Sequence, residues 1–264
     1  MKSFKNLLGT INYSVITIII LVLVLFPIPV LFIDFIVLLN LFFSFLLMLD
    51  VYFGKKKDDY SFFPGLLIVF TIVNMSVNIV ITRQILTLGE DFNDIVIRYA
   101  ALPLTGLNSD LLMAVLTVLF LIAAVYLFFA GKTINRIENL ASRFTQDVRL
   151  ERIAEIETEY YSRVITEKEV ADRKDSLGRE FEYFDLLEDS IRLFSLYEKF
   201  RLVFIIMNSA GGYLIGTRIR NEITNDAFIN YISLATAGGF LSLVSGVFLT
   251  LAINVFYSRI KSFL

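Results

Sequence analysis

The sequence predicts an all-α fold, a polytopic bundle of about six transmembrane helices with a helical insert on the cytosolic side. Three observations support this prediction. The 264 residues are 56% hydrophobic, with a mean hydropathy of +0.71. Six apolar segments reach or exceed the roughly 18 residues that cross a bilayer as a helix. One highly charged stretch, residues 132–198, interrupts them. Such long, continuous runs do not suit the strands of a membrane barrel, so we expect helices.

The apolar segments are taken in chain order. Residues 7–26 follow Lys2 and Lys5 and resemble a signal peptide. They lack a small-residue cleavage site and further spans follow, so we interpret them as a retained first helix, ended by Pro27 and Pro29. The other segments comprise residues 28–53, 62–88, 110–130, 200–217 and 228–256. The last is long enough to tilt or to break at residues 237–239.

Basic residues predict the orientation of the chain, because Lys and Arg are enriched in cytoplasmic loops. If the chain crosses six times, the lysines near residues 2–5 and 55–57, the charged stretch and the basic C-terminal end all fall on one side. We therefore expect a multi-pass protein of the bacterial inner membrane with both termini in the cytosol. The predicted domains are residues 1–131 with four spans, 132–198 as the insert, and 199–264 with two spans.

The cytosolic insert, residues 132–198, carries 11 Lys and Arg and 16 Asp and Glu, a net charge of 11 − 16 = −5. Between residues 133 and 164 apolar side chains recur every three to five positions, which predicts an amphipathic helix or a helix pair. Residues 168–179 are polar and contain Gly178, so we expect a turn there.

Composition excludes several kinds of chemistry. The chain has no Cys and no His, which removes thiolate nucleophiles and the commonest metal ligands. We find no phosphate-binding loop, no nucleophile–base pair and no metal-binding cluster. The sequence therefore predicts a protein that is not an enzyme and that needs no cofactor. We also expect no nucleic acid among its partners.

Polar side chains within the spans have two readings each. Asp34 is either a proton-binding carboxyl or a structural acid, which would lie at the membrane interface or contact another subunit. Arg83 either extends to the membrane surface or pairs with an acid near residues 90–91 or on a neighbouring subunit. Asn74 and Asn78 share a face with two threonines, and packing between helices is the favoured reading over a water path. Glycines at 211–212, 216, 238–239 and 246 predict close helix packing.

Several segments, taken in order, resemble one known family. The stretches RFTQDVRLERIAEIETEYYSRVI, REFEYFDLLEDSIRLF and IIMNSAGGYLIG are similar to the FHIPEP family of flagellar and type III secretion export gates. PIPVLFIDFIVLLNLFFSFLLML and FFPGLLIVFTIVNMSVNIVITRQIL agree with its early spans. The resemblance implies a ring-forming membrane subunit of a protein-export apparatus that uses the proton-motive force. Its partners would be membrane lipid, other copies of the chain, other export-apparatus proteins and exported substrates.

The resemblance also implies residues for charge or proton coupling. They are Asp34, Arg83, Asp147, Arg152, Glu157, Glu159, Glu188 and Arg192. The chain departs from the family pattern where Leu150 and Glu151 replace a Pro-Gly pair, which allows a helix to continue. The sequence stops where the family's large cytosolic domain would begin. We expect a divergent paralogue that lacks this domain, rather than a piece of a longer protein.

Other functions remain open from the sequence. A fourth span that runs into a charged amphipathic helix is typical of a signalling or scaffold protein with a juxtamembrane relay. A degenerate paralogue with a purely assembly role is a further alternative. A small-solute transporter ranks last, because the two halves show no internal repeat.

Overall fold

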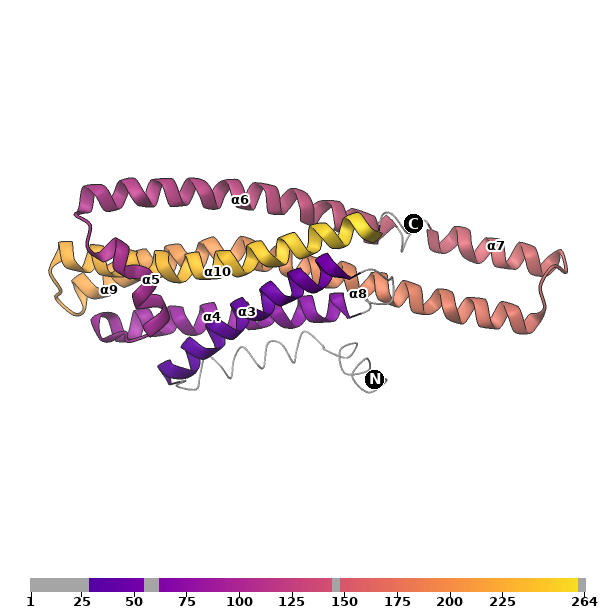
Figure 1. The fold of residues 1–264 in the computed structure, drawn as a ribbon, viewed down its shortest axis with the longest axis horizontal. Helices are drawn as coiled ribbons and strands as arrows, with labels where there is room; N and C mark the ends of the chain where they lie inside the picture. The colour runs from indigo at the N-terminus through magenta and orange to yellow at the C-terminus, as the bar shows by residue number, and fades with distance from the viewer. Residues whose placement is uncertain (1–28, 55–61, 144–147, 261–264) are drawn as a thin grey trace.

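The computed structural model describes residues 29–54, 62–143 and 148–260, and within them every regular element is helical (Figure 1). The elements are α3 (Val30–Phe53), α4 (Phe63–Leu88), η2 (Gly89–Asp91), α5 (Ile95–Thr105), α6 (Ser109–Arg143), α7 (Arg149–Tyr161), α8 (Glu167–Ile206), η4 (Met207–Gly211), α9 (Gly212–Arg218) and α10 (Thr224–Ile260). The predicted all-α class is confirmed. The predicted first span, residues 7–26, lies outside the described residues.

Five helical segments of the described chain are long and apolar enough to cross a membrane. They are Leu31–Phe53, Phe63–Leu88, Ser109–Arg143, Glu167–Arg218 and Thr224–Arg259. They correspond to the second to sixth predicted spans, so these spans are confirmed as membrane-spanning candidates. The helices lie alongside one another, with α10 in contact with α3, α4, α5, α6, α8 and α9 (Figure 1).

The glycine-rich parts of the last two spans do not interrupt the bundle. α10 continues through Gly238 and Gly239 without a break. A Cβ at Gly239 would overlap the side chain of Ile205 on α8, and one at Gly212 would overlap the ring of Tyr231. The predicted close packing at these two glycines is confirmed. Between α8 and α9, the chain widens into the π-helical turn η4 without leaving its helical path.

Within the charged stretch, α7 and the first half of α8 form a helical hairpin, which projects from one end of the bundle (Figure 1). α6 runs on from its apolar part to Arg143, and α7 then packs against the first half of α8. Because α6 and α8 cross residues 131 and 198 as continuous helices, the domain boundaries predicted there fall within single helices. The division into three domains stays a prediction.

The turn predicted at residues 168–179 is wrong, because these residues lie inside α8. The chain turns before them, and Thr166 starts α8 through a capping box with Glu169. Gly178 costs about 1 kcal/mol relative to Ala in a helix interior, but the surrounding Lys, Arg, Glu and Leu residues favour the helix. A single glycine therefore does not end it.

Two buried apolar clusters hold the elements together. One lies toward the hairpin and includes Ile137 of α6 and Phe184 of α8, with Phe63 stacked on Phe256 at a centroid distance of 4.2 Å. The other joins α4, α5 and α10 at the opposite end and includes Ile97 and Tyr231. Polar contacts also join the helices, among them those of Asn40 with Asn74 and of Asn78 with Tyr197.

Candidate functional site

A row of buried polar side chains connects four helices inside the bundle. The Nδ2 of Asn40 on α3 donates to the Oδ1 of Asn74 on α4 at 2.7 Å, and the reverse amide contact is 3.2 Å. One turn along α4, the Nδ2 of Asn78 lies 2.8 Å from the hydroxyl of Tyr197 on α8 and 2.9 Å from that of Ser242 on α10. These amides link neighbouring helices, as we predicted when we favoured helix packing over a water path for Asn74 and Asn78.

The row leads to a buried ion pair on α8. The Nη2 of Arg201 donates to the Oε1 of Glu198 at 2.6 Å. Glu198 is 3% exposed and Arg201 is 2% exposed. The guanidinium lies 5.0 Å from the ring centre of Tyr197, and on its other side it fills the space that a Cβ of Gly246 on α10 would need. The pair therefore fixes the spacing between α8 and α10.

The ion pair is only partly satisfied by its neighbours. Among the described residues, Oε2 of Glu198 and Nε and Nη1 of Arg201 make no hydrogen bond, although they are buried. Taking an ion pair out of water is expensive unless further hydrogen bonds satisfy both groups. A cavity of about 20 Å³ beside the row, lined by Asn40, Asn78 and Ser242 among others, has room for about one water molecule.

Sequence reasoning missed this pair. Glu198 and Arg201 are three residues apart, at helical spacing for an ion pair, but the predicted start of the fifth span at residue 200 separated them. An Arg inside a predicted span is a recognisable signal of function or pairing. Its burial depends on α10, which no local pattern around residue 201 reveals.

Asp34 lies at a contact between α3 and α5. It is 7% exposed, and its carboxylate accepts hydrogen bonds from the backbone N–H groups of Ile95 at 3.2 Å and Val96 at 2.8 Å. Beside it is Asp94, which is fully buried and accepts from the N–H of Ile97 at 2.8 Å. The sequence indicated Asp34 but not Asp94. Burial, supported by the neighbouring Asp34 carboxylate, raises the pKa of Asp94 to about 7.

The acids predicted in the insert take part in ion pairs that connect its helices. Glu157 and Glu159 of α7 contact Lys174 at 3.0 Å and Arg173 at 2.7 Å on α8. These four side chains are largely in contact with solvent, so the pairs are typical of a hydrated helix interface.

At the base of the hairpin, Arg192 pairs with Glu188 at 2.9 Å and lies 3.6 Å from Glu138 of α6. This contact holds α8 against α6. Arg83 is half-buried near the end of α4, and Asp147 lies outside the described residues. The coupling roles predicted for these residues stay predictions.

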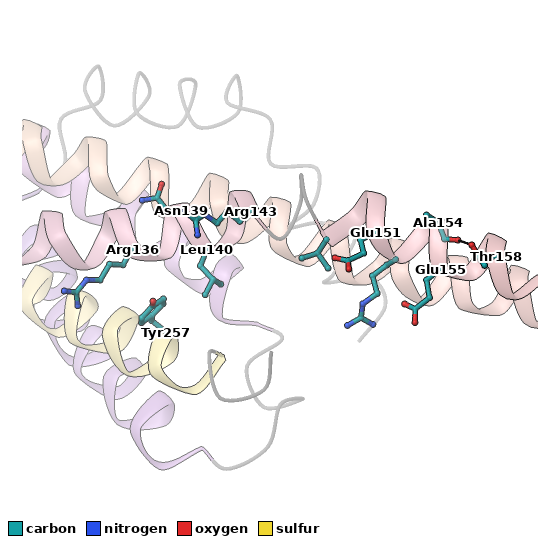
Figure 2. A pocket seen from close by; sticks show the side chains of 11 residues that line it. Arg136, Asn139, Leu140, Arg143, Glu151, Ala154, Glu155, Thr158 and Tyr257 are labelled. Carbon is teal, nitrogen blue, oxygen red and sulfur yellow. Dashed lines mark hydrogen bonds between the residues drawn. The ribbon is translucent and has the colours of Figure 1, made fainter.

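Arg152 lines a groove of about 910 Å³ between α6, α7 and the end of α10 (Figure 2). Arg136, Arg143, Glu151 and Glu155 also line it, so both charge signs are present. In the described part of the chain, no group of three or more His, Cys, Asp or Glu residues is placed to hold a metal ion.

Long apolar helices, polar contacts buried between them and a charged hairpin at one end define a multi-pass helical membrane protein. The model of the FHIPEP family matches residues 19–263. The chain belongs to the FHIPEP family, as the sequence resemblance predicts.

Curated relatives carry flagellar and secretion names. The chain is 31% identical to a flagellar biosynthesis protein FlhA of Treponema pallidum (strain Nichols) over 234 residues, 88% of this chain and 33% of that protein. It is 28% identical to the FlhA of Borreliella burgdorferi, over 88% of this chain and 34% of that protein. It is 26% identical to the harpin secretion protein HrpI of Erwinia amylovora, over 91% of this chain and 33% of that protein. The chain thus spans about a third of the length of these relatives, and no solved structure matches it.

Proposed function

We propose that this chain is a membrane subunit of a flagellar or type III protein-export apparatus in the bacterial inner membrane. Membership of the FHIPEP family and the names of the relatives support this function. Five membrane-crossing candidates and a charged hairpin at one end support a subunit that joins the bilayer to a water-filled compartment. Its proposed partners are membrane lipid, further copies in a ring, other export-apparatus proteins and exported substrates.

The proposed orientation places the hairpin and both termini in the cytosol. The end of α10 lies near the base of the hairpin, in agreement with a cytosolic C-terminus on the same side (Figure 1). Because the chain has no Cys, one introduced thiol reports its own location. Glu155→Cys in α7 should react with a membrane-impermeant reagent only after the cells are opened. Labelling in intact cells would contradict this topology.

We also propose that the subunit couples proton movement to export through the Glu198–Arg201 pair. Its burial in the bundle is the single observation that carries this proposal. A proton on Glu198 would remove the charge that holds the guanidinium and weaken the contact between α8 and α10. Since α8 also forms one side of the hairpin, the change would reach the cytosolic side.

The proposal also includes the charged residues that the family resemblance indicates. Glu157 and Glu159 form ion pairs between the two helices of the hairpin. Glu188 and Arg192 form an ion pair at its base, where Arg192 also lies near Glu138 of α6. We propose that they transmit the movement of α8 or shape contacts between subunits. Asp34, Arg83, Asp147 and Arg152 are proposed to contribute to the same coupling.

Secretion measured in the host tests the coupling. Glu198→Gln keeps the shape of the side chain and removes its charge, so secretion of export substrates, measured per amount of the protein in the membrane, should fall at least several-fold. Asp185→Asn, at an exposed acid of the same helix, is the matched control and should secrete normally. Normal secretion by Glu198→Gln would contradict proton coupling through this pair.

Particle size tests the assembly separately. A closed ring with several copies, purified together with other export proteins, is expected in mild detergent. A monomer or dimer without such partners would favour the alternative of a signalling or scaffold protein. A ring that assembles but does not support secretion in any form would favour a paralogue with an assembly role.

A further inference from the structure

Two carboxylates meet at the start of α5, at the end of the bundle opposite the hairpin (Figure 1). Asp34 extends from α3 and accepts from the N–H groups of Ile95 and Val96, while Asp94 accepts from that of Ile97. The first three N–H donors of α5 are therefore used by two acids from different elements. An N-cap needs one acid, so the second carboxylate requires another explanation.

The second oxygen of Asp94 provides an independent observation. Asp94 is fully buried, and its Oδ2 has no hydrogen-bond donor among the described residues. A buried carboxylate oxygen without a donor is costly, more so beside a second negative charge. A proton on either acid supplies the missing donor and removes one of the two charges. We propose that Asp34 and Asp94 form a carboxyl pair that binds one shared proton at this end of the bundle.

The charged groups on neighbouring elements leave this pair without a cationic partner in any hydrogen bond or ion pair of the described residues. On α5 the Nε of Arg98 donates to the carbonyl of Phe92. Asp91 of η2 is acidic and exposed. Beyond α9, Arg220 binds the carbonyls of Leu86 and Thr87 and, with Glu222, the hydroxyl of Tyr231 on α10. The positive end of the α5 dipole favours one negative charge on the pair, and in the part of the chain that the structure describes no Lys or Arg forms an ion pair with either acid.

Binding of the proton ties α3 to α5, and α5 packs against α10 through Ile97 and Ala101. The pair thus lies on helices that reach the same central helix as the Glu198–Arg201 pair. The direction of proton entry rests on the proposed function: with the hairpin in the cytosol, the carboxyl pair faces the opposite compartment, from which protons enter under the proton-motive force.

The test is an infrared pH titration of the full-length chain in lipid nanodiscs, following the carbonyl band of protonated carboxylic acid. The wild type should show one acid that titrates near pH 7, because burial and Asp34 raise the pKa of Asp94 to about 7. Asp94→Asn should abolish this band and keep the helix cap, since Asn caps as well as Asp. Asp34→Asn should move the midpoint down by about one unit or more, because one negative neighbour is gone. Asp110→Asn, at an exposed acid of the first turn of α6, is the control and should leave the band unchanged.

Thermal stability in the same nanodiscs provides a second readout. The folded-state pKa of Asp94 is raised from 3.8 to about 7, so the folded chain binds the proton more tightly than the unfolded chain. The resulting stabilisation is present at low pH and is lost as the pH rises to 7. The wild type should therefore melt at a higher temperature at pH 5 than at pH 8, and Asp94→Asn should show a smaller difference.

The outcomes separate this proposal from the proposed function. A wild type without a carboxyl that titrates between pH 6 and 8, or a band that survives in Asp94→Asn, overturns the shared proton whatever the secretion assay gives. If the band behaves as expected but secretion by Asp94→Asn is normal, the proton site stands and its part in export is refuted.

Discussion

The buried ion pair makes a prediction that stability measurements can test. Replacing Arg201 by Met leaves Glu198 charged in the bundle, and Glu198→Gln leaves the guanidinium unpaired. Removing one partner of a buried pair typically costs about 3–5 kcal/mol, because an uncompensated charge remains. We expect each single variant to lose a free energy of unfolding in this range.

The double variant, Glu198→Gln with Arg201→Met, should behave differently. It loses the 2.6 Å hydrogen bond but also removes both charges and the two guanidinium nitrogens that lack partners among the described residues, and it leaves an uncharged amide in place of the carboxylate. Replacement of whole buried pairs by apolar residues is often neutral or even stabilising, by about 1–4 kcal/mol, and two uncharged side chains likewise avoid the cost of a buried unpaired charge. The double variant should therefore be more stable than either single variant, with a departure from additivity of about 3 kcal/mol or more.

The assay is a double-mutant cycle, with unfolding in mixed micelles followed by circular dichroism. The matched control is the same cycle on Glu188 and Arg192, an ion pair on the same helix whose side chains are 19% and 56% exposed. A pair of that kind contributes about 0.3–0.5 kcal/mol. If the Glu198–Arg201 cycle is additive, or if its single variants are no less stable than those of the control, the charges of this pair do not hold α8 to α10.

Three further predictions test the packing of the helices and the stability of the hairpin. Gly212→Ala should destabilise the protein by about 1–3 kcal/mol, because its Cβ would overlap the ring of Tyr231. Its control is Gly211→Ala, whose Cβ would lie 3.4 Å from Leu86 and which should change the free energy of unfolding by less than about 1 kcal/mol. Thermal unfolding measures both variants. Thr166→Ala removes the cap of α8 and should cost about 1 kcal/mol, seen as faster amide exchange in the first turn of that helix. Glu159→Gln removes a hydrated ion pair and should change the melting of the hairpin little, by less than about 1 kcal/mol, with the remaining effect lost in high salt.

Sequence patterns predicted the transmembrane helices well, for a physical reason. In lipid, a long apolar run must satisfy its own backbone, and a helix is the structure available to a single segment. The runs at residues 28–53 and 62–88 accordingly match α3 and α4 within two residues at each end. The hairpin was harder, because its turn at residues 162–166 contains neither Gly nor Pro, and Arg163 supplies the positive φ of 57°. We predicted the turn at residues 168–179 because of Gly178, which in fact lies within α8.

The candidate site was predicted only in part, because its geometry comes from segments far apart in the chain. Asp34 was visible as an acid in an apolar run, but its partner Asp94 looks like an ordinary helix cap until α3 is placed beside α5. Glu198 and Arg201 looked like the charged border of a span. Their burial requires Gly246 on α10, 45 residues beyond Arg201 in the chain, to leave space for a guanidinium.

Because α8 is one continuous helix, it connects the Glu198–Arg201 pair to the hairpin. Glu167 and Glu198 lie on one helix, which at 1.5 Å per residue places the tip of the hairpin, where α7 turns into α8, about 46 Å from the pair. The nearest irregular backbone is η4, which begins six residues after Arg201, on the side away from the hairpin. Such single π turns inside α-helices are rare and are frequent at functional sites. Movement of Arg201 against Gly246 would therefore pass into the hairpin, while η4 and the close contact of Gly212 with Tyr231 keep the opposite end in place. In such a bundle, a change at the ion pair acts on the hairpin through α8, the helix that the two share.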